Sequence, residues 1–165
     1  MIADLKARGR GKRESGAFLL GPLEGKTITE YICYDDLDPR SLDTGIIEFD
    51  HIGFSKLWPY CVKKQIRVYA DVHTHPGGGT RQSGLDIDNP MIVEKGHIAF
   101  IVPNYAQNNR QHLQGVGVYE YLGSKKWATQ TVSPNFINLF KETPYGTISR
   151  YCKQIIAYFS GKRRA

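Results

Sequence analysis

The sequence predicts a single domain of the mixed α/β class, in which helices flank a mixed β-sheet. The chain has 165 residues, a length that suits one domain. Hydrophobic residues make up 41% of it and charged residues 23%, which argues against disorder, a collagen-like repeat or a coiled coil. Some apolar segments have the period of a strand and others that of a helix, so both kinds of element are expected.

The N-terminal part of the chain predicts one helical segment and three strands. Residues 1–13 predict a short, weakly amphipathic helix or an arm. A strand over Ala17–Leu20 ends at Gly21-Pro22, and a second strand over Thr27–Tyr34 can pair with it as a hairpin. Gly45–Phe49 follows a turn-rich stretch and predicts a third strand.

The middle of the chain predicts an uncertain helix followed by a long strand. Residues 51–65 place apolar side chains at near-helical spacing, but Pro59 predicts that a helix here is broken or begins late. Arg67–His75 predicts an apolar strand, which stops at Pro76 and the three glycines after it.

The remaining elements alternate between helix and strand. Ser83–Asp86 predicts the start of a helix, and Ile98–Val102 and Val116–Tyr121 predict two further strands. From residue 125 to residue 165 we expect a C-terminal helical extension, because the apolar residues between 148 and 159 repeat as in an amphipathic helix.

The net charge of +6 is concentrated at the two ends of the chain. Basic residues crowd Lys6–Arg13 and Lys162–Arg164, whereas the middle carries mixed signs. Charged ends of this kind are usually solvated. We therefore do not expect a nucleic-acid partner, and contact of these ends with nucleic acid or an acidic protein is the minor alternative.

The apolar segments and the cysteines indicate the cellular compartment in which the protein is expected. The longest apolar stretches are too short to cross a bilayer, and Met1 is followed by a charged segment without an apolar signal region. The sequence therefore predicts a cytoplasmic protein with no membrane partner. The three cysteines are widely spaced among apolar or aromatic neighbours, which predicts reduced thiols.

A cluster of possible metal ligands follows the strand that ends at His75. His73 and His75 lie two residues apart on this strand, so their imidazoles leave the same face. The glycine-rich turn after them lets Ser83 and Asp86 return to that face. Two imidazoles and one carboxylate, with a fourth position left to water, are the ligand set of a catalytic zinc ion. Taken singly, the histidines could be an exposed pair and Ser83 with Asp86 a capping box.

This spacing, His-x-His-Pro with Ser-x-x-Asp beginning seven residues after Pro76, resembles the JAMM motif of the JAB/MPN metalloproteases. Glu14–Gly21 is similar to the opening segment of that family, and Asn89–Met91 and Gly96–Pro103 are similar to its bacterial branch. The likeness covers a core of about residues 14–121.

Two further segments narrow the resemblance. Tyr34–Pro39 and Ala70–Pro76 are most similar to small stand-alone bacterial members of this family. Those members are encoded beside ubiquitin-activating-like and conjugating-like enzymes in antiphage operons. The resemblance therefore implies an MPN-like fold over the single domain 1–165 and a place in a bacterial antiphage conjugation system.

The resemblance also implies the chemistry of the site. His73, His75 and Asp86 would hold Zn²⁺, Glu14 would act as general base and then general acid, and Ser83 would donate a hydrogen bond to the developing oxyanion. The implied activity is that of a deubiquitinase-like, zinc-dependent isopeptidase. Its partners would be a ubiquitin-like modifier, the conjugates of that modifier, and the activating-like and conjugating-like enzymes.

Two alternative functions remain at this point. The same residues would serve a peptidase that trims the tail of a small modifier or sulfur-carrier precursor. A non-catalytic MPN scaffold would bind partners without cleaving them.

Three other residues near the motif are candidates for a role in the site. Asp71 shares the strand face of the two histidines and could orient one of them, but we interpret it as a surface aspartate. His97 is expected to be a core or hydrogen-bonded histidine. Asp88 lies two residues beyond the matching aspartate and is not expected to be a ligand.

Overall fold

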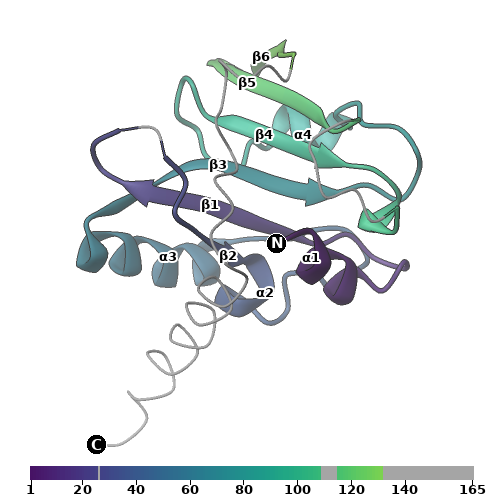
Figure 1. The fold of residues 1–165 in the computed structure, drawn as a ribbon, viewed down its shortest axis with the longest axis horizontal. Coiled ribbons are helices and arrows are strands. Elements are labelled where there is room, and N and C mark those ends of the chain that lie inside the picture. Colours follow the sequence, from purple (N-terminus) through teal and green to yellow (C-terminus); the bar gives the residue numbers. More distant parts are fainter. Residues whose placement is uncertain (26, 109–114, 132–165) are drawn as a thin grey trace, which may run out of the picture.

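Six strands form one sheet in the order β2-β1-β3-β4-β5-β6 (Figure 1). The computed structural model describes residues 1–25, 27–108 and 115–131. The strands are β1 (Gly16–Pro22), β2 (Glu30–Cys33), β3 (Ile66–Thr74), β4 (Ile98–Val102), β5 (Gly117–Gly123) and β6 (Lys126–Thr129).

The sheet is mixed, as the sequence predicts. Strands β3 and β4 run parallel, and the other neighbouring strands run antiparallel. The first two strands form the expected hairpin, with Ala17 opposite Cys33. Because β3 and β4 are parallel, their carboxyl ends meet at one edge of the sheet, the usual position for a ligand site in such sheets.

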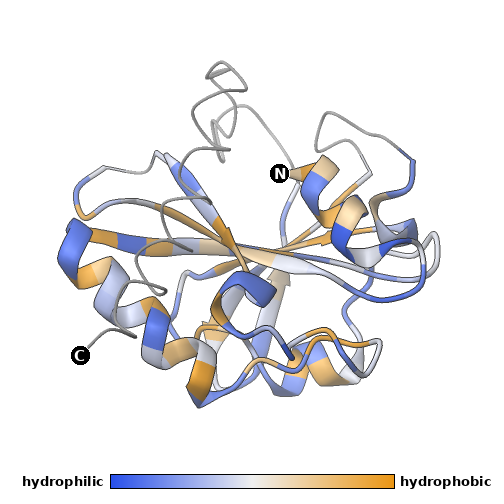
Figure 2. Ribbon diagram, turned by 90° about the horizontal axis from the view of Figure 1, so that it is seen from below, coloured by the Kyte–Doolittle hydropathy of each residue, from blue (hydrophilic) through white to orange (hydrophobic). Residues whose placement is uncertain are grey.

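Helices cover both faces of this sheet, which makes the fold a single mixed α/β domain. Figure 2 looks along the sheet, with α1 beside the N-terminus on one side and the long helix α3 on the other. Among the described residues, no helix is long and apolar enough to cross a membrane. The helices are α1 (Ile2–Gly9), α2 (Tyr34–Leu37), α3 (His51–Lys64), α4 (Gly84–Asp88) and the 3₁₀ turn η1 (Asn104–Ala106).

Alternation along the strands divides the core into two clusters. Leu19 and Val72 face the α1 side with Leu5 of that helix. Phe18 and Leu20 face the other side, where Leu57 of α3 covers them. The apolar residues from Ala17 to Leu20 therefore alternate between the two clusters, and Asp71 and His73 of β3 lie on the face that α3 covers in part.

The strand predicted over Gly45–Phe49 is wrong, because this segment has no strand partner and runs as a loop. Its apolar side chains Ile47 and Phe49 pack against the cluster beneath α3, which explains the strand-like composition. The loop still has a role in the site region. Its Gly45 carbonyl accepts a hydrogen bond of 2.9 Å from the backbone N–H of Glu14.

The predicted break at Pro59 is also wrong, because α3 runs without interruption from His51 to Lys64. The side chain of Asp50 caps the helix by accepting a 2.8 Å hydrogen bond from the backbone N–H of Ile52. Pro59 removes a hydrogen bond to the carbonyl of Ser55, but both residues are exposed. Water can therefore satisfy that carbonyl, and the helix tolerates the proline.

The start of the expected C-terminal helical extension differs from the prediction. Residues 126–129 form strand β6, which pairs with β5 across a tight turn. Ser124 and Lys125 in this turn have φ values of 52° and 58°, as a two-residue hairpin with the correct twist requires. The helix predicted between residues 148 and 159 and the basic residues 162–164 lie outside the described residues.

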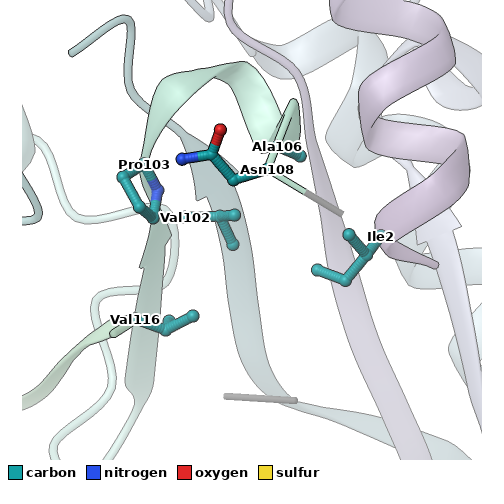
Figure 3. A pocket seen from close by; sticks show the side chains of 6 residues that line it. All are labelled: Ile2, Val102, Pro103, Ala106, Asn108 and Val116. Atoms are coloured by element: carbon teal, nitrogen blue, oxygen red, sulfur yellow. The ribbon is translucent and has the colours of Figure 1, made fainter. Parts of the chain in front are cut away.

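A small apolar pocket opens beside α1 at the ends of β4 and β5 (Figure 3). Its volume is about 10 Å³, enough for a single water molecule at most. It lies on the α1 side of the sheet, away from His73 and His75, and is therefore separate from the candidate site. It is lined by Ile2, Val102, Pro103, Ala106, Asn108 and Val116.

Gly16 is required by close packing at the start of β1. An alanine Cβ at this position would lie 2.3 Å from the ring of Tyr34 and 2.8 Å from the carbonyl oxygen of Val72. We predict that Gly16→Ala lowers the free energy of unfolding by about 2 kcal/mol or more, since overpacked positions typically cost 1–3 kcal/mol. Urea denaturation followed by circular dichroism measures this.

Gly77→Ala is the matched control for this prediction. In the part of the chain that the structure describes, no atom lies within 4 Å of a Cβ added at Gly77. Its unfolding free energy should change by less than about 0.5 kcal/mol. Equal stabilities of the two variants would contradict the packing argument.

Candidate metal centre

The two histidines of the motif meet at the carboxyl end of β3. His73 lies within the strand and pairs with Gly16 of β1. His75 follows the strand, and its backbone N–H still donates a 2.9 Å hydrogen bond to Val102 of β4. The Nε2 atoms of the two imidazoles are 3.2 Å apart. Both rings therefore direct the same nitrogen to one point.

Asp86 reaches this point from helix α4. Its Oδ1 lies 3.3 Å from His73 Nε2, and its Oδ2 lies 3.3 Å from His75 Nε2. One ligand atom from each of the three side chains can be chosen so that all lie within 4.8 Å of one another. The structure thus brings together the three residues that the sequence proposed as ligands.

The capping box predicted for Ser83 and Asp86 orients this carboxylate. The backbone N–H of Ser83 donates a 2.6 Å hydrogen bond to Asp86 Oδ2, and the backbone N–H of Asp86 donates a 3.2 Å hydrogen bond to Ser83 Oγ. Asp86 can therefore cap the helix and serve as a metal ligand at the same time. The Ser83 side chain is exposed beside the carboxylate, and its hydroxyl can still donate a hydrogen bond.

The hairpin of β5 and β6 supports α4. The indole N–H of Trp127 donates to the Ile87 carbonyl at 3.3 Å, and Lys125 Nζ lies 3.1 Å from Asp88 Oδ1. The hydroxyl of Tyr119 donates a 2.9 Å hydrogen bond to the carbonyl of Thr80, in the loop that leads to α4. These contacts hold the short helix over the carboxyl end of the sheet.

A left-handed turn holds the other end of that loop. Asn104, Tyr105 and Ala106 have φ values of 56°, 50° and 59°, a rare run for residues other than glycine. The N–H of Asn104 donates to the carbonyl of Gly77, and the N–H of Tyr105 donates to that of His75, both at 2.8 Å. Backbone strain of this kind occurs preferentially at functional sites.

The electrostatics of the centre favour a cation. Burial opposes protonation of His73, but the hydrogen bonds and charges of Asp71 and Asp86 outweigh it and raise the pKa of His73 to about 10. Burial acts to raise the pKa of Asp86, but hydrogen bonds from His73 and His75 hold it well below its usual range. Two carboxylates thus stabilise positive charge at this point, and a metal ion would replace the proton there.

Glu14 lies at the rim of the centre. Glu14 lies two residues before Gly16, which pairs with His73, and the charges of His73, His75 and Asp86 all act on its carboxyl. Its side chain is half-buried. Burial raises the pKa of the Glu14 carboxyl, and the charges of His73 and His75 act in the opposite direction. A carboxylate with a raised pKa beside a metal centre suits proton transfer near neutral pH.

Asp71, behind the histidines, is not the surface residue that we interpreted it to be from the sequence. Asp71 is only 2% exposed, so the surface reading is wrong. His97 is 4% exposed and hydrogen-bonded to Asp71, which confirms the expectation for that histidine. Tyr34 also reaches this carboxylate and was missed, because no spacing in the sequence connects it with β3. The position of Asp71 on the same strand face as His73 was the feature of the sequence that could have indicated this contact.

Two other polar residues of the described chain, Asp88 and His51, take no part in the centre. Asp88 is exposed and pairs with Lys125. His51 is exposed at the start of α3 and lies 3.5 Å from Asp50. His112 is outside the described residues.

The donor set fits a divalent ion of the first transition row. Imidazole nitrogens suit zinc, copper, iron and nickel, and a single carboxylate with two imidazoles leaves a coordination position for water in a catalytic zinc site.

Comparison with known proteins gives a structural similarity but no family. The chain matches no family model. Its structure is similar to the solution structure of the protein DSY2949 from Desulfitobacterium hafniense, with a TM-score of 0.53 and 14% sequence identity. The match covers 88% of this chain and 92% of that chain. At this level of identity the likeness shows a shared fold alone.

Proposed function

We propose that this protein is a zinc-dependent isopeptidase that removes a ubiquitin-like modifier from its conjugates. The observation that carries the proposal is the convergence of His73, His75 and Asp86 on one point, with Glu14 close enough for their charges to act on its carboxyl. The resemblance of this motif to the JAB/MPN metalloproteases supplies the substrate class. It also supplies the setting, a bacterial antiphage conjugation system in the cytoplasm.

His73, His75 and Asp86 would hold the zinc ion. When bound, zinc supplies a Lewis acid that activates water and polarises the carbonyl of the scissile bond. The three side chains leave one side of the centre open, because His75 and Asp86 are only partly buried. Substrate can therefore approach from solvent.

Glu14 would move the proton of the reaction. From its position at the rim it would accept a proton from the attacking water and deliver it to the leaving amine of the lysine side chain. Partial burial supports this role, because the raised pKa of Glu14 lets it both accept and release a proton.

Ser83 would stabilise the developing oxyanion. Its exposed hydroxyl accepts a bond from the Asp86 backbone and can donate its own proton outward. A donor that acts only as the oxyanion forms is worth a few kcal/mol in the barrier. The helix cap fixes the position of this hydroxyl before substrate arrives.

The glycine loop after His75 would leave room for the modifier tail. Gly77, Gly78 and Gly79 are exposed. A backbone in extended conformation can lie close to such a loop, where side chains would obstruct it. The extended C-terminal tail of a ubiquitin-like modifier has the required shape.

The test is cleavage of a modifier linked through its C-terminal carbonyl to a lysine side chain. The zinc-loaded protein should release the intact modifier, 1,10-phenanthroline should abolish cleavage, and added zinc should restore it. Iodoacetamide should have no effect. Cys33 and Cys61 are buried, and burial raises the pKa of the Cys61 thiol to about 11, so neither of these two provides a reactive thiolate. Cys152 lies outside the described residues.

A conjugate whose modifier lacks its C-terminal tail is the matched control substrate and should not be cleaved. Binding of the intact conjugate without cleavage, in the presence of zinc, would contradict the proposal and favour a scaffold. Cleavage of linear precursors but not of isopeptide bonds would favour tail trimming instead.

A further inference from the structure

A buried polar cluster lies directly behind His73. Asp71, His97 and Tyr34 are 2%, 4% and 0% exposed, and they come from β3, the residue before β4, and α2. Burying a carboxylate is costly unless donors surround it. A buried carboxylate held directly behind a candidate ligand calls for a reason beyond packing.

The carboxylate of Asp71 has three partners, one on Oδ1 and two on Oδ2. Its Oδ1 lies 2.7 Å from His97 Nε2. Its Oδ2 accepts a 3.3 Å hydrogen bond from the hydroxyl of Tyr34 and lies 3.5 Å from His73 Nδ1. The short contact with His97 fixes the carboxylate, and Tyr34 and His73 share the other oxygen.

The sheet register produces this arrangement. Asp71 pairs with Ala99 of the parallel strand β4, so His97, two residues earlier, lies on the same face. Asp71 and His73 also share a face of β3. On the far side, Gly16 has no side chain, and the Tyr34 ring occupies that space.

An ionised carboxylate can only accept hydrogen bonds. Asp71 lies among three polar groups, His97 Nε2, the Tyr34 hydroxyl and His73 Nδ1, at 2.7 to 3.5 Å, and the ionised carboxylate is the form that can accept from all three. The nitrogens that face it, His97 Nε2 and His73 Nδ1, must then both carry hydrogen. A neutral His73 with its hydrogen on Nδ1 presents a free lone pair on Nε2, the atom that faces His75 and Asp86.

We infer that Asp71 is a positioning residue of the metal centre, which holds the His73 ring in place and selects the tautomer whose Nε2 binds the ion. His97 anchors Asp71 in turn. The inference rests on the metal centre of the proposed function, but not on the reaction or the substrate. Partners of metal-bound histidines typically contribute 10–100-fold to metal affinity.

The test compares Asp71→Asn with Tyr34→Phe. Asparagine keeps the shape of the side chain, but it has only one acceptor oxygen. Its amide nitrogen is a donor, so the side chain cannot accept hydrogen bonds from both His97 and His73. Asp71→Asn should weaken zinc binding about 10–100-fold in a chelator competition and alter the visible spectrum of the Co²⁺-loaded protein. Tyr34→Phe removes a hydrogen bond from the same carboxylate without touching His73, and its zinc affinity should stay within about threefold of the unmodified protein.

Unchanged zinc affinity in a folded Asp71→Asn variant would overturn the inference. So would an equal loss in Tyr34→Phe, which would indicate a general effect on packing. Should Asp71→Asn fail to fold, His97→Leu and His97→Gln replace it. Glutamine keeps a donor for Asp71 Oδ1, whereas leucine does not. The zinc affinity of His97→Leu should therefore fall several-fold, and that of His97→Gln should not. Equal zinc affinities of the two variants would overturn the inference.

These outcomes are independent of the reaction. A protein that binds zinc and depends on Asp71 for it, but cleaves no conjugate, would support this inference and contradict the proposed isopeptidase. A protein that does not bind zinc at all would overturn both.

Discussion

Replacement of either motif histidine by alanine is expected to abolish stable zinc binding. His73→Ala and His75→Ala each leave two protein ligands where the centre offers three. Loss of a residue that only supports a ligand already costs 10–100-fold in affinity, so loss of a ligand should cost more than about a hundredfold. Elemental analysis after dialysis against a weak chelator measures the zinc content, and conjugate cleavage should disappear with it.

His51→Ala is the control for these variants, because the His51 side chain is 87% exposed at the start of α3 and does not belong to the group that converges with Asp86. It should retain one zinc ion per chain and full activity. If both His73→Ala and His75→Ala kept zinc at full occupancy, the assignment of ligands would be wrong.

The substitution Glu14→Gln is expected to preserve zinc and lower turnover by at least about a hundredfold, since a positioned proton-transfer group typically contributes 10²–10⁴-fold. Glutamine has nearly the same shape but cannot accept the proton. The backbone N–H of Glu14 is bonded to Gly45, so the local structure should persist. Single-turnover cleavage with the zinc-loaded variant separates this effect from substrate binding.

Glu94→Gln makes the same chemical change at a glutamate that pairs with Arg67, at the other end of β3. It should cleave at the normal rate. Near-normal cleavage by zinc-loaded Glu14→Gln would show that another group transfers the proton.

The three candidate ligands could be proposed from sequence because they lie close together along the chain. Strand periodicity places His73 and His75 on one face, and the glycine turn and the capping pattern at Ser83 return Asp86 to it. Local rules suffice for such a group. Glu14 is different, because it reaches the centre only through the pairing of β1 with β3. The sequence could indicate it by family resemblance alone.

The features that sequence reasoning missed depend on tertiary structure. Asp71 is buried because α2 places Tyr34 over it, and no local pattern shows that α2 lies there. Ile47 and Phe49 pack on the core from a loop, so their composition resembled that of a strand. Pro59 is tolerated in α3 because it faces solvent, which depends on how the whole helix packs.

Helix α4 has only five residues, and all of them are exposed or half-buried. So short a helix has little stability of its own, and local opening of such a segment requires far less free energy than unfolding of the sheet. An ion shared by Asp86, His73 of β3 and His75 just after it would hold this segment against the sheet. Occupancy of the centre would then set the amide exchange rates of α4, and removal of the ion would open the crossover between β3 and β4 while the core stayed folded.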